Sequence, residues 1–480
     1  MKKSIILLAS IAAIAAGCAK EQPASPENGK IQVTFAAETE NAKSALDGKA
    51  ISWATKDVIA VWDGTGKNEF VYSSKSEFTG TVTANQSGTY YVVYPYYYVL
   101  KDKNGNENVV GQEFVAGDDP EMKVWTTIPS CQIATANSFA PFANLSACKA
   151  TLVDSKLCGT MTNLCGYLKF TVTDAATTPI KKIRFESVDA AKRMSGVGYV
   201  QFTDTEITAT GVDAFYVDCV PSDRKNFSNG TYYLAVYPNY YRSGIKITMI
   251  GTDGSVYETT TNSFTLARNA VANFGEITSD LSSKKTEKFA VIADFYNDGE
   301  AFSKPTTETE FTMTQNSIKY SFSTTSNNTS KASGPYKAKT DNQYLTFTQG
   351  QLGTPALEDK TLKEINIVWK SHNTNYRGKF IVSTTNANND TSNSLTGRYW
   401  LRNQTDFTSN DTYFFISNAG STKMTALFYS HKFTLGKKSA NETSLGSSVT
   451  LSEPEAGERY YISNGDSNAS LVDHIELIYE

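Results

Sequence analysis

Apolar and polar residues alternate with a period of two in short runs along most of this 480-residue chain. Four clear runs cover residues 30–38, 166–174, 180–187 and 244–261. Successive side chains of a β-strand point to opposite faces, so this alternation is typical of strands with one buried face. Within the last run, Asp253-Gly254 separates two alternating segments, which is a strong hairpin signal. The pattern therefore predicts an all-β chain.

Two tyrosine-rich runs resemble each other closely: "GTYYVVYPYYY" at residues 88–98 and "GTYYLAVYPNYY" at residues 230–241. Each follows a glycine turn and alternates as a core-facing strand does, and its proline closes the strand where the missing N–H harms no ladder. The repeat predicts two copies of one β-sandwich. Four tyrosines are predicted to lie in the core or at a sheet edge rather than on a sugar-binding platform: Tyr90, Tyr94, Tyr232 and Tyr237. The tyrosines beyond each proline are predicted to be more exposed: Tyr96, Tyr97, Tyr98, Tyr240 and Tyr241.

The folded part divides into three blocks. The repeat places the first two at residues 30–137 and 138–279, and a polar, charged break follows at residues 279–288. Residues 289–480 contain short strands joined by Asn, Ser and Gly loops, which is typical of a sandwich or jelly roll. We therefore expect two tandem sandwiches followed by a jelly-roll-like domain.

The N-terminus predicts export. Residues 1–17 have a basic head and an apolar stretch that is too short to span a bilayer, which is typical of a signal peptide. The segment resembles a bacterial lipoprotein signal with Cys18 as the lipidated residue; the alternative, an ordinary secretory signal, is less favoured. Residues 18–29 are polar and read as a flexible tether. These features predict a lipid-anchored protein of the outer membrane, facing the cell surface.

Five further cysteines follow Cys18: Cys131, Cys148, Cys158, Cys165 and Cys219. Their odd number means that at least one is unpaired or pairs between chains. The simplest interpretation is small buried residues, with room for one or two disulfides. No CxxC spacing occurs and the three histidines lie elsewhere, which argues against a zinc site.

Charge and motifs argue against several function classes. The net charge is −4 and no basic stripe appears, so nucleic-acid binding has little support. Ser222 and Lys225 fit SxxK, but that motif needs a helix and this region reads as a loop. No nucleophile elbow, phosphate loop or HExxH occurs. We therefore expect no enzyme activity and no cofactor.

The third block offers the candidate ligand residues. A sugar site needs a flat aromatic ring with planar polar groups beside it, and two segments combine these residue types. The candidates are Tyr399, Trp400, Arg402, Asn403, His372, Tyr376 and Arg377. A core position for Trp400 is favoured over ligand contact, and Trp369 is assigned to the core because it alternates with Ile365 and Ile367.

One acidic segment offers oxygen ligands of the kind that Ca²⁺ binds, although it lacks the full EF-hand pattern. Its candidate ligands are Asp294, Asn297, Asp298 and Glu300. An ordinary acidic loop is the favoured alternative.

The first two blocks resemble the fimbrillin family, the surface lipoproteins that build or anchor type V pili. The resemblance rests on an ordered set of segments over about residues 30–279: "VTFAA", "ISWATKDVIAVW", "TYYVVYP", "IPSCQ", "GYLKFTVTD", "IKKIRFES", "GYVQFTD", "TYYLAVYP" and "SFTLARNAVANFGEI". It implies two transthyretin-like sandwiches and assembly with other fimbrial subunits by strand exchange. The third block resembles carbohydrate-binding-like jelly rolls through "NQYLTFTQGQ", "LKEINIVWK" and "VDHIELIYE", which implies a glycan or surface-protein ligand.

One departure from the family bears on the role of the chain. Stalk subunits of the best-known type mature by cleavage after an arginine, whereas the first arginine here is Arg184, deep in the second block. Either another protease acts, at Lys30, Lys43 or Lys49, or the chain is not a stalk subunit. The sequence predicts an accessory, tip or anchor subunit with a C-terminal adhesive domain. The alternative is a stand-alone surface lipoprotein that binds glycans and uses the first blocks as a spacer.

Overall fold

The prediction of an all-β chain is confirmed, because every regular element that the structure describes is a strand. The computed structural model describes residues 30–39, 53, 57–74, 77–84, 87–95, 97–99, 122–175, 177, 179–211, 214–277, 284–294, 310–315, 318–325, 336–337, 345–347, 351–371, 380–383, 414–416, 427–435, 454–464 and 470–480. Within these ranges, no helix has the length and apolar character needed to cross a bilayer.

The first part of the chain closes into a barrel. Its strands, in order around the barrel, are β1 (Lys30–Thr39), β10 (Lys156–Asn163), β9 (Ser146–Val153), β5 (Thr89–Tyr94), β2 (Val58–Trp62), β3 (Lys67–Ser74) and β4 (Glu77–Thr83). β1 runs parallel to β10 and antiparallel to β4. The alternation at residues 30–38 has the predicted result, since Val33 and Phe35 are buried with Phe70 and Phe78 in the barrel core.

A second core joins the barrel to the next block. It contains Trp62 of the barrel, Phe202 of β13 and Tyr237, together with Leu164 and Tyr167. The sheet over this core consists of β14 (Ile207–Gly211), β13 (Gly196–Phe202) and β7 (Met122–Ile128). Because one set of side chains fills the space between the two blocks, they form a continuous body, which we call the stem (residues 30–277).

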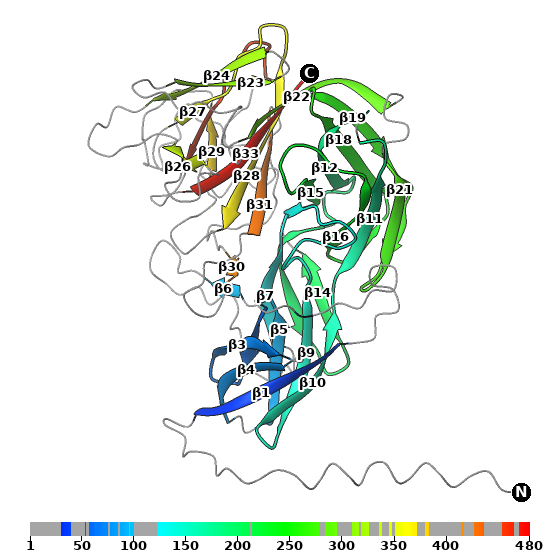
Figure 1. Ribbon diagram of the computed structural model, residues 1–480, viewed down its shortest axis with the longest axis vertical. Helices are drawn as coiled ribbons and strands as arrows, with labels where there is room; N and C mark the ends of the chain where they lie inside the picture. Colours follow the sequence, from blue (N-terminus) through cyan, green and yellow to red (C-terminus); the bar gives the residue numbers. More distant parts are fainter. Residues whose placement is uncertain are drawn as a thin grey trace, which may run out of the picture.

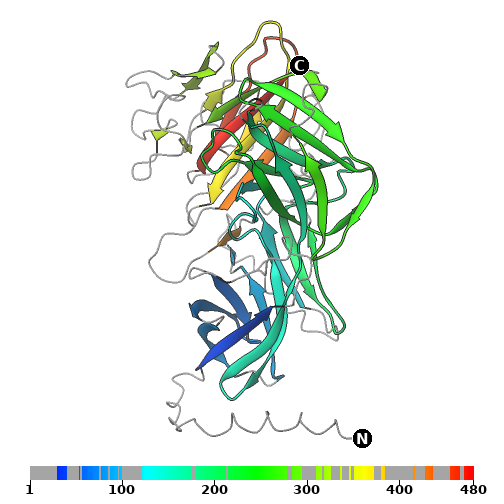
Figure 2. The same cartoon turned by 45° about the vertical axis from the view of Figure 1, so that its right-hand side comes forward.

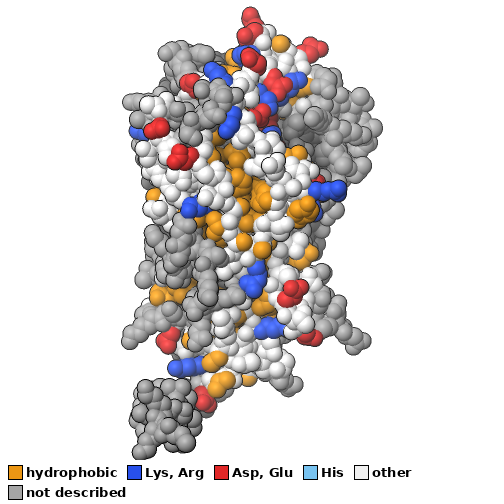
Figure 3. All heavy atoms as spheres, turned by 90° about the vertical axis from the view of Figure 1, so that its right-hand side faces the viewer, with side chains coloured by type: hydrophobic (Ala, Val, Ile, Leu, Met, Phe, Trp, Pro, Cys, Tyr) orange, Lys and Arg blue, Asp and Glu red, His pale blue; other side chains and the backbone are white. Residues whose placement is uncertain are grey.

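The second block is a sandwich around its own core. One layer is the sheet β16 (Gly230–Val236), β11 (Gly166–Val172) and β21 (Val271–Glu276), with β17 (Asn239–Tyr241) and β20 (Phe264–Leu266) pairing beside it. Its core brings Phe170 of β11 against Phe185 of the opposite layer, with ring centroids 5.5 Å apart. Figure 3 shows apolar side chains gathered along the middle of the face that lies to the right in Figure 1.

The opposite layer continues from the stem into the C-terminal unit (residues 284–480). Its strands, in order, are β22 (Lys285–Asp294), β19 (Ser255–Thr260), β18 (Ile245–Gly251), β12 (Ile180–Ser187), β15 (Tyr216–Val220), β8 (Cys131–Ile133), β31 (Leu427–Thr434), β28 (Leu362–Ser371), β33 (Ser470–Tyr479), β26 (Leu345–Phe347) and β25 (Tyr336–Lys337). β22 also pairs with β33, so the strands from β22 to β33 close into a ring. The C-terminal unit and the second block therefore lie side by side, above the barrel (Figures 1 and 2).

A further sheet covers the outer side of the C-terminal unit. It consists of β23 (Glu310–Gln315), β24 (Ile318–Thr325), β27 (Gln351–Gly353), β32 (Tyr461–Asn464) and β29 (Phe380–Ser383). Leu352 and Ile462 from this sheet share a core with Ile365, Ile367 and Trp369 of β28, so the core assignment of Trp369 is confirmed. β6 (Tyr97–Val99) and β30 (Phe414–Ile416) form a separate pair that joins the stem to this unit.

The block boundaries drawn from the sequence need two corrections. β9 and β10 follow the boundary placed at residue 138, yet they complete the first barrel by pairing with β5 and β1. The third block, placed at residues 289–480, begins inside β22, which starts at Lys285 and pairs with β19 of the stem as well as with β33. The repeat located the two tyrosine strands correctly but not the strands that cross between blocks.

Candidate functional site

Three neighbouring stem strands carry charged side chains at alternate positions. On β12, Ile183 and Phe185 enter the core of the second block, so Lys182, Arg184 and Glu186 point to the other face. On β15 the same alternation puts Val217 and Cys219 in that core and turns Tyr216 and Asp218 away from it. Lys246 and Thr248 of β18 join this second face. A period-two strand with one apolar face thus builds a charged surface into the ring.

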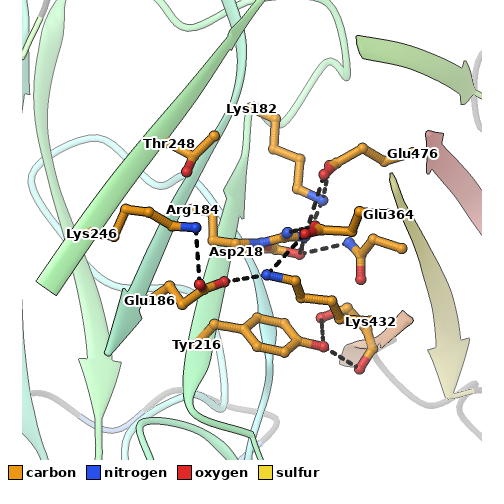
Figure 4. Close-up of polar contacts among 12 residues, drawn as sticks. Lys182, Arg184, Glu186, Tyr216, Asp218, Lys246, Thr248, Glu364, Lys432 and Glu476 are labelled. Atoms are coloured by element: carbon orange, nitrogen blue, oxygen red, sulfur yellow. Dashed lines mark hydrogen bonds and ion pairs between the residues drawn. The ribbon is translucent and has the colours of Figure 1, made fainter. Parts of the chain in front are cut away.

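The C-terminal unit presents a matching surface from three of its own strands. On β28, Ile365 and Ile367 enter the core of that unit, whereas Glu364 and Asn366 point toward the stem. β33 and β31 follow the same rule. The inward side chains of these strands are Glu476 of β33 and Ser430 and Lys432 of β31. Figure 4 shows the two sets of side chains meeting inside the ring.

Ion pairs join the two surfaces at their centre. The Lys182 ammonium lies 3.0 Å from the Asp218 carboxylate and also pairs with Glu476. Arg184 donates from Nε to Asp218 Oδ1 at 2.7 Å, and its Nη2 lies 3.4 Å from Glu476 Oε1. The second terminal nitrogen of Arg184, Nη1, pairs with Glu364. Asp218 is completely buried, so these cations replace the water that the carboxylate would otherwise bind.

A second group of charges extends the network toward the surface. Lys432 pairs with Glu186 and lies 3.0 Å from Glu364 Oε2. Lys246, which is about one-third exposed, lies 3.0 Å from Glu186 Oε1. Asn366 donates from Nδ2 to Asp218 Oδ2 at 3.0 Å, which closes the network across the ring. We call this set of residues the charged junction: Lys182, Arg184, Glu186, Asp218, Glu364, Asn366, Lys432 and Glu476.

Two smaller groups of contacts lie at the edges of the junction. At one edge, Ser430 donates its backbone N–H to Ser130 Oγ at 2.7 Å, and Tyr216 donates its hydroxyl to the Ser430 carbonyl at 3.0 Å. At the other edge, Arg224 donates to Asp473 Oδ1 at 3.3 Å, while Asp473 Oδ2 lies 2.8 Å from His474 Nδ1. Asp473 is completely buried, so this pair also spans the interface without water.

Three groups of the junction have pKa values that favour their charged forms: Asp218, Glu186 and Arg184. Burial by itself raises the pKa of Asp218, but Arg184 and Lys182 beside it hold that pKa well below its ordinary range. Burial likewise opposes ionisation of Glu186, and Lys432 and Lys246 lower its pKa to about 2. The pKa of Arg184 is raised, because Asp218, Glu476 and Glu364 outweigh the effect of burial. Each buried charge therefore has an opposite charge beside it.

The charged junction lets the stem and the C-terminal unit recognise each other through complementary charges. Buried ion pairs contribute little net stability compared with an apolar contact, but they are strongly unfavourable when one partner is missing or misplaced. The arrangement therefore selects one orientation of the C-terminal unit on the stem. In the described part of the chain, no group of three or more His, Cys, Asp or Glu residues is arranged to hold a metal ion.

The predicted ligand and lipid residues lie outside the described residues. These are Cys18, His372, Tyr376, Arg377, Tyr399, Trp400, Arg402 and Asn403. Of the calcium candidates, Asn297, Asp298 and Glu300 also lie outside, and Asp294 is described. Asp294 is buried, and its carboxylate lies 3.4 Å from the ammonium of Lys181. Asp294, one of the four candidate calcium ligands, is therefore already paired with the Lys181 ammonium.

The four tyrosines assigned to the core are buried: Tyr90, Tyr94, Tyr232 and Tyr237. Tyr94 donates its hydroxyl to Asp57 Oδ1 at 2.9 Å, and Tyr237 donates to the Gly196 carbonyl at 3.1 Å. Beyond the second proline, Tyr240 is 50% exposed, as predicted, whereas the prediction was wrong for Tyr241, which is 0% exposed. Tyr241 lies on β17 with its ring 5.2 Å from Phe264, so its strand continues the core past the proline.

The five cysteines that follow Cys18 are free thiols in the structure, so the disulfides allowed by the sequence are absent among these residues. Four of them are buried, as the simplest interpretation expects, and Cys158 is exposed. Burial raises the pKa of the Cys165 thiol to about 12, which makes that residue an inert part of the core.

Sequence reasoning did not identify the charged junction. The alternation at residues 180–187 predicts a strand with one buried face, and it does not indicate what meets the charged face. A signal was nevertheless present, because residues 180–187 contain three cations and residues 473–480 contain three anions, and opposite charges on two strand faces are complementary.

No family model and no curated protein matches the chain. Among solved structures, a putative cell adhesion protein from Bacteroides uniformis is similar over 54% of this chain and 96% of its own, with 12% identity and a TM-score of 0.33. A putative cell adhesion protein from Bacteroides ovatus is similar over 53% and 94%, with 12% identity and a TM-score of 0.33. A fimbrial protein from Bacteroides ovatus is similar over 79% and 72%, with 12% identity and a TM-score of 0.26.

Proposed function

We propose that the chain is a cell-surface adhesion protein of the fimbrillin type, held in the outer membrane by a lipid on Cys18. It serves as an accessory, tip or anchor subunit of a fimbrium, and its C-terminal unit meets the ligand. The observation that carries this proposal is that the first and last strands, β1 and β33, are each paired along both edges.

β1 links the barrel to the lipid anchor. It begins at Lys30, a short distance after Cys18, and its side chains Val33 and Phe35 fill the barrel core. A cut after Lys43 or Lys49 would remove β1, and it would open a groove between β4 and β10. The same cut would release the chain from its lipid. An intact barrel and a lipid anchor therefore occur together, which suits a subunit that remains at the membrane.

β33 is not available as a donor strand in this fold. It pairs with β28 along one edge and with β22 and β26 along the other. Ile475, Leu477 and Tyr479 fill the core of the C-terminal unit, so withdrawing the strand would dismantle that core. A chain that keeps both terminal strands suits an end position in a fimbrium better than a place in the middle of a polymer.

The charged junction adds a mechanical argument. An adhesive unit can transmit force to the membrane only if it is held firmly to its anchored stem. The buried pairs of Arg184 and Lys182 with Glu364 and Glu476 fasten the two parts in one orientation. The mechanism that we propose is thus non-catalytic.

The test is crosslinking on intact cells, followed by mass spectrometry of the mature chain. We expect a chain that begins at Cys18 and retains β1, and a crosslinked partner of the fimbrillin type. The matched control is Cys18→Ala, which should lose the membrane fraction while keeping the same fold. Failure to recover any fimbrillin-type partner would contradict the fimbrial role.

A surface glycan-binding lipoprotein that acts alone is the competing outcome. It predicts saccharide binding by the purified full-length chain together with no partner subunit on cells. Binding that is lost in Trp400→Ala, with an unchanged unfolding midpoint, would place the ligand at the residues that the sequence singled out.

A further inference from the structure

We propose that the charged junction is a clasp. At rest the C-terminal unit is fastened to the stem, and it opens at one seam, between β8 and β31, while it stays attached through β22. The ring of strands consists of a stem half (β19, β18, β12, β15 and β8) and a C-terminal half (β31, β28, β33 and β22). Within the ring, the two halves meet at two seams, and these seams differ in strength. Outside the ring, the pair of β6 with β30 also joins the stem to the C-terminal unit, and it separates when the clasp opens.

The seam between β8 and β31 is the weaker one. Its ladder has one paired position, Phe428 opposite Cys131. The described residues add the contacts of Ser430 with Ser130 and Tyr216 given above. Short ladders break before long ones, because each paired position adds backbone hydrogen bonds.

The seam between β19 and β22 works as a hinge. β22 follows the stem strand β21 in the chain, and it pairs with β19 at two positions, Phe289 opposite Ser255 and Lys285 opposite Tyr257. β22 also returns to the stem, because Ala290 donates its N–H to the Gly254 carbonyl at 2.9 Å. At Gly254 a Cβ atom would lie 2.6 Å from the Phe289 ring, so glycine allows the two strands this close approach. The C-terminal half therefore remains joined to the stem here when the other seam separates.

The ion pairs divide into two classes with respect to this opening. The pairs of Lys182 with Glu476 and of Arg184 with Glu364 cross from one half to the other. The pairs of Lys182 and Arg184 with Asp218 lie within the stem half. Opening thus separates the crossing pairs and hydrates both surfaces, while Asp218 keeps its two cations. In the open state, water solvates the charges that the crossing pairs neutralise in the closed state. Opening therefore requires far less free energy than deleting one partner inside the closed ring.

Cys131 reports the state of the weak seam. It lies on β8 at the single paired position, and it is 1% exposed when the clasp is closed. Opening removes β31 from this edge and brings the thiol into contact with solvent. Cys148, Cys165 and Cys219 are buried in the cores of the stem, so they become exposed only when the stem itself unfolds.

The experiment is alkylation of the folded mature chain carrying Cys18→Ser with iodoacetamide, followed by peptide mass spectrometry. We expect Cys158 to react first, because it is exposed. Cys131 should follow at a rate at least about tenfold above that of the other three buried thiols, since a local opening needs less free energy than global unfolding. If Cys131 reacts only together with Cys148, Cys165 and Cys219, the clasp does not open and the proposal is overturned.

A pair of variants separates the clasp from general stability. Glu476→Gln removes a crossing charge and leaves Lys182 and Arg184 with less compensation, so the Cys131 rate should rise by at least about tenfold. Lys246→Gln is the matched control. Lys246 pairs with Glu186 and Glu258, both within the stem half, and the Cys131 rate should stay within about twofold. Equal effects of the two variants would overturn the assignment of crossing pairs. If Glu476→Gln does not fold, the comparison of the four buried thiols in the chain without this substitution decides whether the clasp opens.

Discussion

Arg224 of the stem donates to Asp473 of the C-terminal unit, with 3.3 Å between Nε and Oδ1. Both side chains are buried, and Asp473 also contacts His474. The pKa of Asp473 is lowered, because Arg224 and His474 outweigh the burial that would raise it. The pair lies far apart in the sequence and close in space, and it holds the last strand of the chain against the stem.

Removing one side of this pair should be costly. Arg224→Met leaves the Asp473 carboxylate buried with only His474 beside it, and we expect the free energy of unfolding to fall by about 3–5 kcal/mol. The double variant Arg224→Met with Asp473→Leu should regain most of that loss, because no buried charge remains. Urea unfolding followed by circular dichroism measures both.

The matched control for this pair is Asp204→Asn. Asp204 is exposed and lies 4.0 Å from Lys149, so its loss should change stability by less than about 1 kcal/mol. If Arg224→Met were as mild as this control, the interface around Asp473 would have to be hydrated.

The Tyr237 side chain leaves no space for a Cβ atom at Gly198 in the stem. A Cβ atom at Gly198 would lie 2.6 Å from the ring and hydroxyl of Tyr237 and 2.3 Å from the Thr210 carbonyl. Gly198→Ala should therefore lower the free energy of unfolding by about 1–3 kcal/mol or more through overpacking. Gly66→Ala is the control, because nothing lies within 4 Å of its added atom, and thermal melting should show a change within about 0.5 kcal/mol. Equal melting temperatures for the two variants would show that the stem core is loosely packed at Tyr237.

Asp63 makes part of the stability of the barrel dependent on pH. Its carboxylate accepts hydrogen bonds from the N–H groups of Thr65, Gly66 and Thr83 and from the Asn68 amide. Burial alone would raise its pKa, but these donors lower the pKa from 3.8 to about 2. A lowered pKa means that the contribution of Asp63 is fully present above its ordinary value and is lost as the pH falls through about 2.

Asp63→Asn tests this contribution. We expect the variant to be less stable than the parent by about 1–3 kcal/mol at pH 6, because a satisfied buried acceptor is lost. The difference between the two chains should shrink as the pH falls from 4 to 2, since the parent then loses its charged acceptor as well. Urea unfolding at fixed pH values gives the difference curve, and a difference that stays constant down to pH 2 would contradict the lowered pKa.

The sequence predicts the strands well where one face is apolar. Val33 and Phe35, Ile365 and Ile367, and the tyrosines of the two "VYP" strands enter cores, because a period-two pattern leaves them no other buried face. The Asp253-Gly254 turn joins β18 to β19 for a similarly local reason, since Gly254 has a φ of +82°.

The arrangement of the blocks was not predictable in the same way. Residues 146–163 look like any other strands, and nothing local shows that they return to the first barrel. The surroundings of the polar face of β12 were still harder to predict. A strand with Lys182, Arg184 and Glu186 on one side normally turns that side to water, and here it meets complementary charges from strands more than 170 positions away in the chain. Only pairing between distant strands decides this outcome.

The central claim is that the C-terminal unit has one fixed orientation on the stem. The direct measurement is the distance distribution between two spin labels, one on the naturally exposed Cys158 of β10 and one on Ala456→Cys, an exposed site of the C-terminal unit, in the mature chain carrying Cys18→Ser. The chain also carries Cys131→Ser, because opening of the clasp exposes this thiol, and the other three buried thiols should stay unlabelled in the folded chain. The account predicts a single narrow distribution that broadens in Glu476→Gln. A broad distribution in the parent chain would contradict the account, because it would mean that the charged junction does not hold the two parts together.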